Sequence, residues 1–147
     1  MMLAMALELP QRDPCPFCEN IAGRNLCAVI EDREATFAFV NPHQLQEGAA
    51  LVIPKRHVPT VFDLADDEAA AVMQCVTRIA RAVSDAYEPE GLQLFQNNGV
   101  AAGQSVPHFH MHIVPRYEGD SFGERVEKSP AAARMQIAER IRLRLLA

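Results

Sequence analysis

Three of the five histidines in the chain stand at alternate positions, His108, His110 and His112, in the run HFHMHIV. Successive side chains of a β-strand point to opposite faces, so a strand would present all three imidazoles on one face. The apolar residues between them would then pack on the core from the other face. A helix would instead spread the same three residues around its surface. The spacing therefore predicts a strand with a functional site on one face.

Two kinds of chemistry fit such a strand. Imidazole nitrogens at this spacing can bind zinc or iron. Alternatively, one histidine is a nucleophile and its neighbours orient it or donate protons. The preceding loop, residues 96–105, combines small residues, glycines, side-chain amides and Ser105. Backbone amides in such a loop can form an anion-binding nest, so the sequence favours phosphate handling beside a nucleophilic histidine over a hydrolytic metal site.

A second group of reactive side chains lies near the N-terminus. Cys15 and Cys18 have the two-residue spacing of a zinc knuckle, and the four cysteines of the chain are too few for a disulfide framework. We therefore expect the pair to bind metal or to be redox-active. His108 becomes a third metal ligand if the N-terminal segment folds over the histidine strand.

Hydrophobic patterning predicts an antiparallel α+β domain that positions these residues. Between the third and fourth predicted strands, apolar residues at steps of three and four predict a helix that begins at an Asp66 N-cap and ends before Pro89. Ser129 and Pro130 mark the start of a C-terminal helix over residues 129–147. Five runs of apolar and β-branched residues have the length of strands, namely 26–31, 36–40, 50–53, 92–96 and 108–114.

Length and composition are those of one globular domain over residues 1–147. The chain is 49% apolar and 22% charged, and a domain of this length buries a core without disulfide or metal support. A net charge of −5 argues against a general nucleic-acid-binding surface, and no apolar run approaches the length of a membrane span. Residues 1–13 are expected to form a flexible N-terminus and not a signal peptide, because no basic stretch precedes their apolar residues. These features predict a cytoplasmic protein that binds neither nucleic acid nor membranes.

The histidine run and its flanks resemble the histidine triad (HIT) superfamily, in particular small bacterial hydrolases related to its Fhit and Hint branches. The similarity covers most of the chain and includes the segments CPFC, FVNP, LVIPKRH, QNNG and AGQS, and the Pro-Arg pair after the histidine strand. It implies the HIT-like fold, with a five-stranded antiparallel sheet and two helices, and a homodimer.

The resemblance also implies a reaction. His110 would be the nucleophile that attacks the α-phosphate of a nucleotide conjugate and forms a covalent nucleotidyl-histidine. His112 would stabilise charge on the phosphate, and His108 would complete the catalytic triad, with no cofactor required. The implied substrates are dinucleoside polyphosphates. The alternatives are a Hint-like nucleoside phosphoramidase and a nucleotide-binding protein without catalytic activity.

Substrate-binding residues follow from the same resemblance. Ser105 and Gln104, beside Gly103, would bind phosphate oxygens and the leaving group. Asn97 would contact the bound phosphate or the leaving group, and Asn41 would bind the ribose hydroxyls.

One position departs from the family pattern. Many relatives have a histidine where this chain has Ala49, and in relatives with a CxxC pair that histidine completes a structural zinc site with the first triad histidine. Here Cys15, Cys18 and His108 would remain as ligands. We therefore expect zinc to be weakly bound or absent unless His43 or a water supplies the fourth ligand.

Overall fold

The computed structural model describes residues 7–146 and contains a five-stranded sheet in the order β1-β2-β3-β5-β4. All four neighbouring pairs of strands are antiparallel. The strands are β1 (Val29–Asp32), β2 (Thr36–Val40), β3 (Ala50–Pro54), β4 (Gly91–Phe95) and β5 (Met111–Arg116). The architecture confirms the predicted α+β class with a five-stranded antiparallel sheet.

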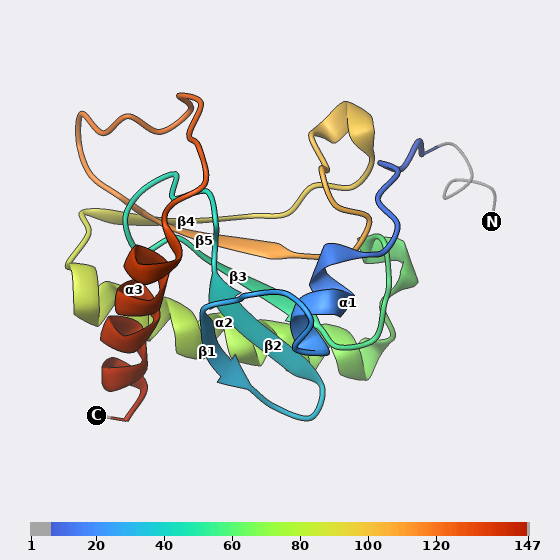
Figure 1. The fold of residues 1–147 in the computed structure, drawn as a ribbon, viewed down its shortest axis with the longest axis horizontal. Coiled ribbons are helices and arrows are strands. Elements are labelled where there is room, and N and C mark those ends of the chain that lie inside the picture. The colour runs from blue at the N-terminus through green and yellow to red at the C-terminus, as the bar shows by residue number, and fades with distance from the viewer. Residues whose placement is uncertain (1–6, 147) are drawn as a thin grey trace.

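Two long helices, α2 (Asp66–Tyr87) and α3 (Ala131–Leu145), cover one face of the sheet. Figure 1 shows α2 running behind the sheet with α3 near its C-terminal end. A short helix α1 (Pro16–Ile21) and two 3-10 turns, η2 (Val61–Asp63) and η3 (Val100–Ala102), complete the elements. The sequence predicts only the two long helices, because α1 is too short to show a hydrophobic period.

Alternation along the strands divides the buried side chains into two cores. Ala38 and Val40 of β2 pack with residues of α2 and α3. Phe37 and Phe39 point to the opposite face, where Phe17 of α1 packs on Phe39 with ring centroids 5.3 Å apart. Every residue of β2 and β3 is buried, since these central strands are covered on both faces. The second core lies on the face that carries the histidines.

The histidine strand is shorter than predicted. β5 begins at Met111 and not at residue 108, so His112 is the triad histidine that lies on it. Upstream, the amide of His108 donates to the carbonyl oxygen of Val106, and the amide of Phe109 donates to the carbonyl oxygen of Val58. Residues 108–110 therefore run extended beside the segment after β3 without joining the ladder.

The starts of three other elements also differ from the prediction, and most remaining boundaries agree to within one or two residues. β1 begins at Val29 and not at residue 26. Asp66 is the first residue of α2 and not its N-cap; the N-cap is Ala65, whose amide donates to the Glu68 carboxylate at 2.9 Å. Pro130, and not Ser129, is the N-cap of α3.

The N-terminal segment contacts the loop before the histidines. The carbonyl oxygen of Glu8 accepts a hydrogen bond from the amide of Val100 at 2.8 Å. Residues 1–6 lie outside the described part of the chain, and the flexibility of residues 1–13 stays a prediction. Within residues 7–146, no helix is long and apolar enough to cross a membrane.

Candidate functional site

Phe109 anchors the segment that carries the first two triad histidines. Its side chain is buried in the core formed with α2 and α3. Because neighbouring side chains of an extended chain point to opposite sides, His108 and His110 point to the α1 face. There the ring of Phe17 meets the His110 ring edge-on at 5.1 Å, and the His110 and His112 rings are 5.0 Å apart. The predicted clustering of the imidazoles on one face is confirmed.

A backbone hydrogen bond determines which nitrogen of His110 is reactive. Its Nδ1 lies 2.7 Å from the carbonyl oxygen of His108. A carbonyl oxygen only accepts, so Nδ1 carries the proton and Nε2 keeps a lone pair. Burial lowers the pKa of His110 below its ordinary value, which keeps the imidazole neutral at pH 7. A buried, neutral imidazole with its proton on Nδ1 is suited to nucleophilic attack through Nε2.

His112 is held differently. Its ring lies parallel to the ring of Phe95, with centroids 4.1 Å apart and an interplanar angle of 7°. Its Nδ1 is buried and has no hydrogen-bond partner among the described residues. Burial, together with the nearby His110, lowers the pKa of His112 to about 3. His112 is therefore a neutral imidazole, which carries one proton on either Nδ1 or Nε2.

Several backbone amides of the loop before the histidines are occupied by hydrogen bonds within the protein. The amides of Ala102, Gly103 and Gln104 donate to carbonyl oxygens of residues 99 and 100 within the loop. The amide of Gly99 donates to the Gln104 side chain at 2.7 Å, and that of Val100 donates to the N-terminal segment. The turn at η3 therefore occupies these five amides, and phosphate binding by the remaining amides of the loop stays a prediction.

Gln104 has a structural position. Its side-chain amide nitrogen donates to the carbonyl oxygens of Pro59 and Val106, at 2.7 Å and 3.0 Å, while its oxygen accepts from Gly99. The side chain is buried and joins the loop to the segment after β3. Its role is therefore to hold the loop, and its amide is not available for the leaving group.

Two other loop residues predicted from the sequence remain candidates for binding substrate. Ser105 is exposed at the end of the loop. Asn97 lies beside Gly103, where a side-chain carbon added at position 103 would lie 3.5 Å from the Asn97 amide nitrogen. Gly103 has a φ of +90°, a conformation that favours glycine.

Asn41 is buried at the end of β2 and starts a turn. Its side-chain oxygen accepts a hydrogen bond from the amide of His43 at 3.0 Å. The Asn41 side chain therefore stabilises a turn, as is typical of an Asn-Pro pair. Binding of the ribose by Asn41 remains a proposal.

A cluster of two cysteines and two histidines lies beside the triad. The ligand atoms of Cys15, Cys18, His57 and His108 all lie within 4.8 Å of one another. Nδ1 of His108 is 3.5 Å from Cys15 Sγ and 3.2 Å from Nδ1 of His57, which in turn is 3.4 Å from Cys18 Sγ. Nε2 of His108 lies 2.9 Å from the carbonyl oxygen of Pro54, so Nε2 carries the proton and Nδ1 directs a lone pair into the cluster.

The start of α1 brings the two thiols together. Cys15 is the N-cap of this helix, and its sulfur accepts a hydrogen bond from the amide of Cys18 at 3.4 Å. Pro16 occupies the first helical position, where a missing amide proton costs nothing. The sequence therefore folds the CxxC pair into one turn, with both sulfurs facing the triad segment.

The fourth member of the cluster is a correction to the sequence analysis. His57 completes the set, although its place in the run Lys55-Arg56-His57 is typical of a solvated strand end. His43 lies elsewhere, with Nδ1 3.1 Å from the carbonyl oxygen of Val126. The expectation that Ala49 leaves the cluster one ligand short is therefore wrong. His57 lies three residues after β3, so the pairing of β3 with β5, which the sequence does not show, would have been needed to find it.

Comparison with known proteins identifies the family. The model of the HIT domain matches residues 23–119, more than half of the chain. The chain belongs to the HIT family. It is 46% identical to Protein hit of Bacillus subtilis over 110 residues, 74% of this chain and 76% of that protein. Over 102 residues it is 33% identical to the adenosine 5'-monophosphoramidase hnt1 of Schizosaccharomyces pombe, covering 69% of this chain and 74% of that protein.

A solved HIT structure extends the likeness to the fold. The crystal structure of a Zn-bound histidine triad family protein from Mycobacterium smegmatis matches with a TM-score of 0.80. The two proteins are 28% identical, and the match covers 90% of this chain and 94% of that chain. The HIT domain match includes His57 and His108, whereas Cys15 and Cys18 precede it.

Proposed function

We propose that this HIT protein hydrolyses nucleoside 5′-phosphate conjugates at the α-phosphate, through a covalent nucleotidyl intermediate on His110. The observation that carries the proposal is the hydrogen bond from His110 Nδ1 to the carbonyl oxygen of His108, which leaves Nε2 as the nucleophile. The relative from S. pombe, named a monophosphoramidase, supports the same class of substrate.

The reaction has two displacements at phosphorus. In the first, Nε2 of His110 forms a bond to the α-phosphorus while the bond from phosphorus to the leaving group breaks. In the second, water attacks the same phosphorus, the N–P bond breaks, and the nucleoside monophosphate leaves. The departing group takes up one proton and the attacking water releases one, so the enzyme returns to its starting state.

His112 is suited to stabilise charge on the phosphate by donating a hydrogen bond, while the proton for the departing group comes from solvent. A neutral imidazole carries one N–H, and a buried N–H without an acceptor is costly. Because Nδ1 of His112 is buried and unpaired among the described residues, the proton belongs on Nε2. His110 and His112 therefore present opposite groups to the phosphate, a lone pair and an N–H. Ser105 and Asn97 would add hydrogen bonds to the phosphate or leaving group, and Asn41 would bind the ribose.

The decisive experiment is to trap the intermediate. Wild-type protein is mixed with an adenosine phosphoramidate or a dinucleoside polyphosphate and quenched in acid, and its peptides are weighed by mass spectrometry. We expect an adenylate adduct on the peptide that contains His110. His110→Ala should lose both the adduct and turnover while nucleotide affinity stays within about tenfold, or about 1.4 kcal/mol.

Two outcomes would contradict the proposal. Full turnover by His110→Ala would exclude His110 as the nucleophile. Nucleotide binding by the wild type with neither adduct nor turnover would support the alternative of a non-catalytic nucleotide-binding protein. The ratio of turnover on the two substrates distinguishes a Hint-like phosphoramidase from a dinucleoside polyphosphate hydrolase.

We also propose that Cys15, Cys18, His57 and His108 bind a structural zinc ion. Two thiols and two imidazoles are a donor set that zinc favours, and the HIT structure from M. smegmatis is described as Zn-bound. When bound, zinc would cross-link α1, the segment after β3 and the triad segment. The phosphoryl chemistry proposed for His110 requires no metal.

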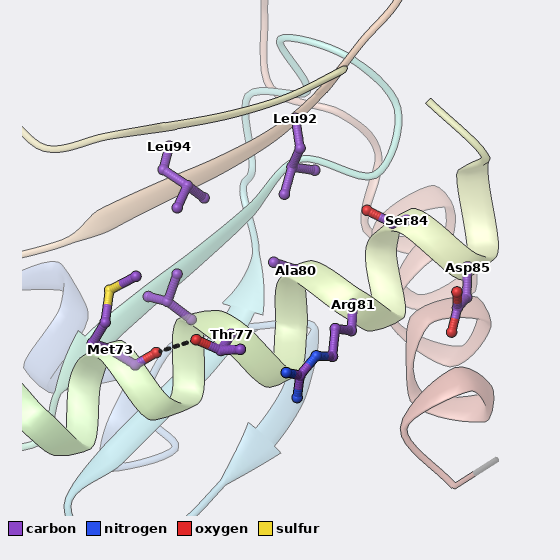
Figure 2. Close-up of a pocket in the computed structure, with 9 residues that line it drawn as sticks. Met73, Thr77, Ala80, Arg81, Ser84, Asp85, Leu92 and Leu94 are labelled. Carbon is purple, nitrogen blue, oxygen red and sulfur yellow. Dashed lines mark hydrogen bonds between the residues drawn. The ribbon is translucent and has the colours of Figure 1, made fainter. Parts of the chain in front are cut away.

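The proposed homodimer would form at β4. This strand is at the edge of the sheet and pairs with β5 alone, so its other edge can pair with a second copy. Figure 2 shows Leu92 and Leu94 of β4 facing Met73 and Ala80 of α2. These side chains line a hollow of about 510 Å³. The apolar side chains of Leu94 and Met73 are exposed, and a second copy docked on β4 would bury them. Leu94→Glu should shift the protein to a monomer in size-exclusion light scattering, unlike Leu143→Glu on α3.

A further inference from the structure

The ring of Phe95 covers one face of the His112 imidazole. Phe95 on β4 lies directly opposite His112 on β5 in the antiparallel register. Directly opposite residues of antiparallel strands have adjacent side chains on the same face. Their rings are parallel within 7° at 4.1 Å, whereas Phe17 meets His110 at 84°. The stack therefore fixes the plane of the His112 ring.

No hydrogen bond within the described residues performs this task. His108 and His110 are each held by a backbone carbonyl oxygen, of Pro54 and of His108, at 2.9 Å and 2.7 Å. Nδ1 of His112 has no such partner. The orientation of the third imidazole therefore depends on packing against the ring that covers it.

Phe95 is itself supported from its other side. Phe122 meets it edge-on, with centroids 6.3 Å apart and an angle of 72°. The guanidinium of Arg116 lies 4.1 Å from the centre of the Phe122 ring. Arg116 is fixed in turn by two hydrogen bonds to Asp120, at 2.8 Å and 3.0 Å, and one to Gln93 at 2.6 Å. The turn after β5 thus braces the stack.

We propose that Phe95 is a positioning residue that holds the His112 imidazole toward the substrate phosphate, and that Phe122 and Arg116 hold Phe95 in place. The proposal rests on the proposed function, because it assigns His112 a role in that reaction. Its consequence is that the rate of the chemical step depends on an aromatic ring that does not touch the phosphate.

The first test is spectroscopic and independent of activity. The ring protons of His112 lie over the face of Phe95, so its ring current should shift their NMR resonances upfield. Comparison with His112→Asn assigns these resonances. Phe95→Leu should lose the upfield shift, and Phe95→Tyr should keep it. Phe37→Leu, which removes a buried ring from the same face of the sheet, should leave the shift unchanged.

The second test is kinetic. A small displacement of a catalytic group lowers the rate of the chemical step without changing substrate affinity. Phe95→Leu should therefore lower kcat about tenfold at unchanged KM. Phe95→Tyr should restore kcat, and Phe37→Leu should leave it within about twofold. Phe122→Leu should give an intermediate loss.

Each result bears on the proposal. If the His112 resonances of Phe95→Leu lose their upfield shift, the proposal is supported. If they stay upfield in this variant, the proposal is overturned. A rise in KM at constant kcat, or an equal loss of kcat in Phe37→Leu, would overturn it as well. Failure of the proposed function is distinguishable, because wild-type protein would then turn over neither substrate in the same assay. An active wild type with any contradicting result overturns the role of Phe95 alone.

Discussion

Replacement of His57 by alanine should weaken zinc binding by about two to three orders of magnitude. Structural zinc in four-ligand sites binds with about 10–16 kcal/mol, so an equal share per ligand is about 2.5–4 kcal/mol. At 1.4 kcal/mol for each factor of ten, that share is about 10²–10³ in affinity. His57 is exposed, so its removal leaves no cavity in the core and the fold should persist.

The assay compares His57→Ala with His43→Ala. Protein purified without chelator is analysed for zinc per chain, and its affinity is measured by competition with a chromogenic chelator. His43→Ala should match the wild type, because its imidazole bonds to the carbonyl oxygen of Val126 outside the cluster. Circular dichroism checks that both variants are folded. Wild-type affinity in His57→Ala, or zinc loss in His43→Ala, would refute the assignment of the fourth ligand.

Three further predictions concern stability. Gln104→Leu, which removes three hydrogen bonds to backbone groups, should lower the free energy of unfolding by about 2–3 kcal/mol in urea titrations. Burial raises the pKa of Glu31, but the hydrogen bond and charge of Arg78, together with the charge of Arg33 and the Cys75 hydrogen bond, outweigh this and keep the pKa below the ordinary value. A lowered pKa adds stability that is lost as pH falls, so acidification from about pH 5 to about pH 3 should destabilise the wild type more than Glu31→Gln; equal losses would contradict this. Gly48→Ala should cost about 1–3 kcal/mol in thermal unfolding, because φ is +101° and the new carbon would lie 2.7 Å from the Tyr87 ring.

The strands could be predicted where apolar runs end at turn residues. The predicted ranges 36–40 and 50–53 match β2 and β3 to within one residue. The start of β5 could not be predicted, because side chains alternate through residues 108–110 whether or not the backbone joins the ladder. Periodicity indicates which face a side chain occupies, whereas the partner of each amide depends on distant segments such as Val58.

In the candidate site, too, features set by local sequence could be predicted and features set by distant segments could not. The clustering of the triad imidazoles follows from local spacing and was predictable. His57 was not, because only the pairing of β3 with β5 brings the segment after β3 to His108. The structural position of Gln104 could not be predicted for a similar reason. The sequence does not distinguish a glutamine that binds substrate from one that bonds to the backbone. Its acceptors, on Pro59 and Val106, come from outside the loop.

The carbonyl oxygen that selects the tautomer of His110 belongs to the main chain of His108. Side-chain substitution cannot delete a main-chain oxygen, so a mutational scan of the site would not detect its contribution. The same residue contributes Nδ1 to the cysteine–histidine cluster through its side chain. Loss of the imidazole at position 108 would therefore report on metal binding, while the proton on the nucleophile stays in place.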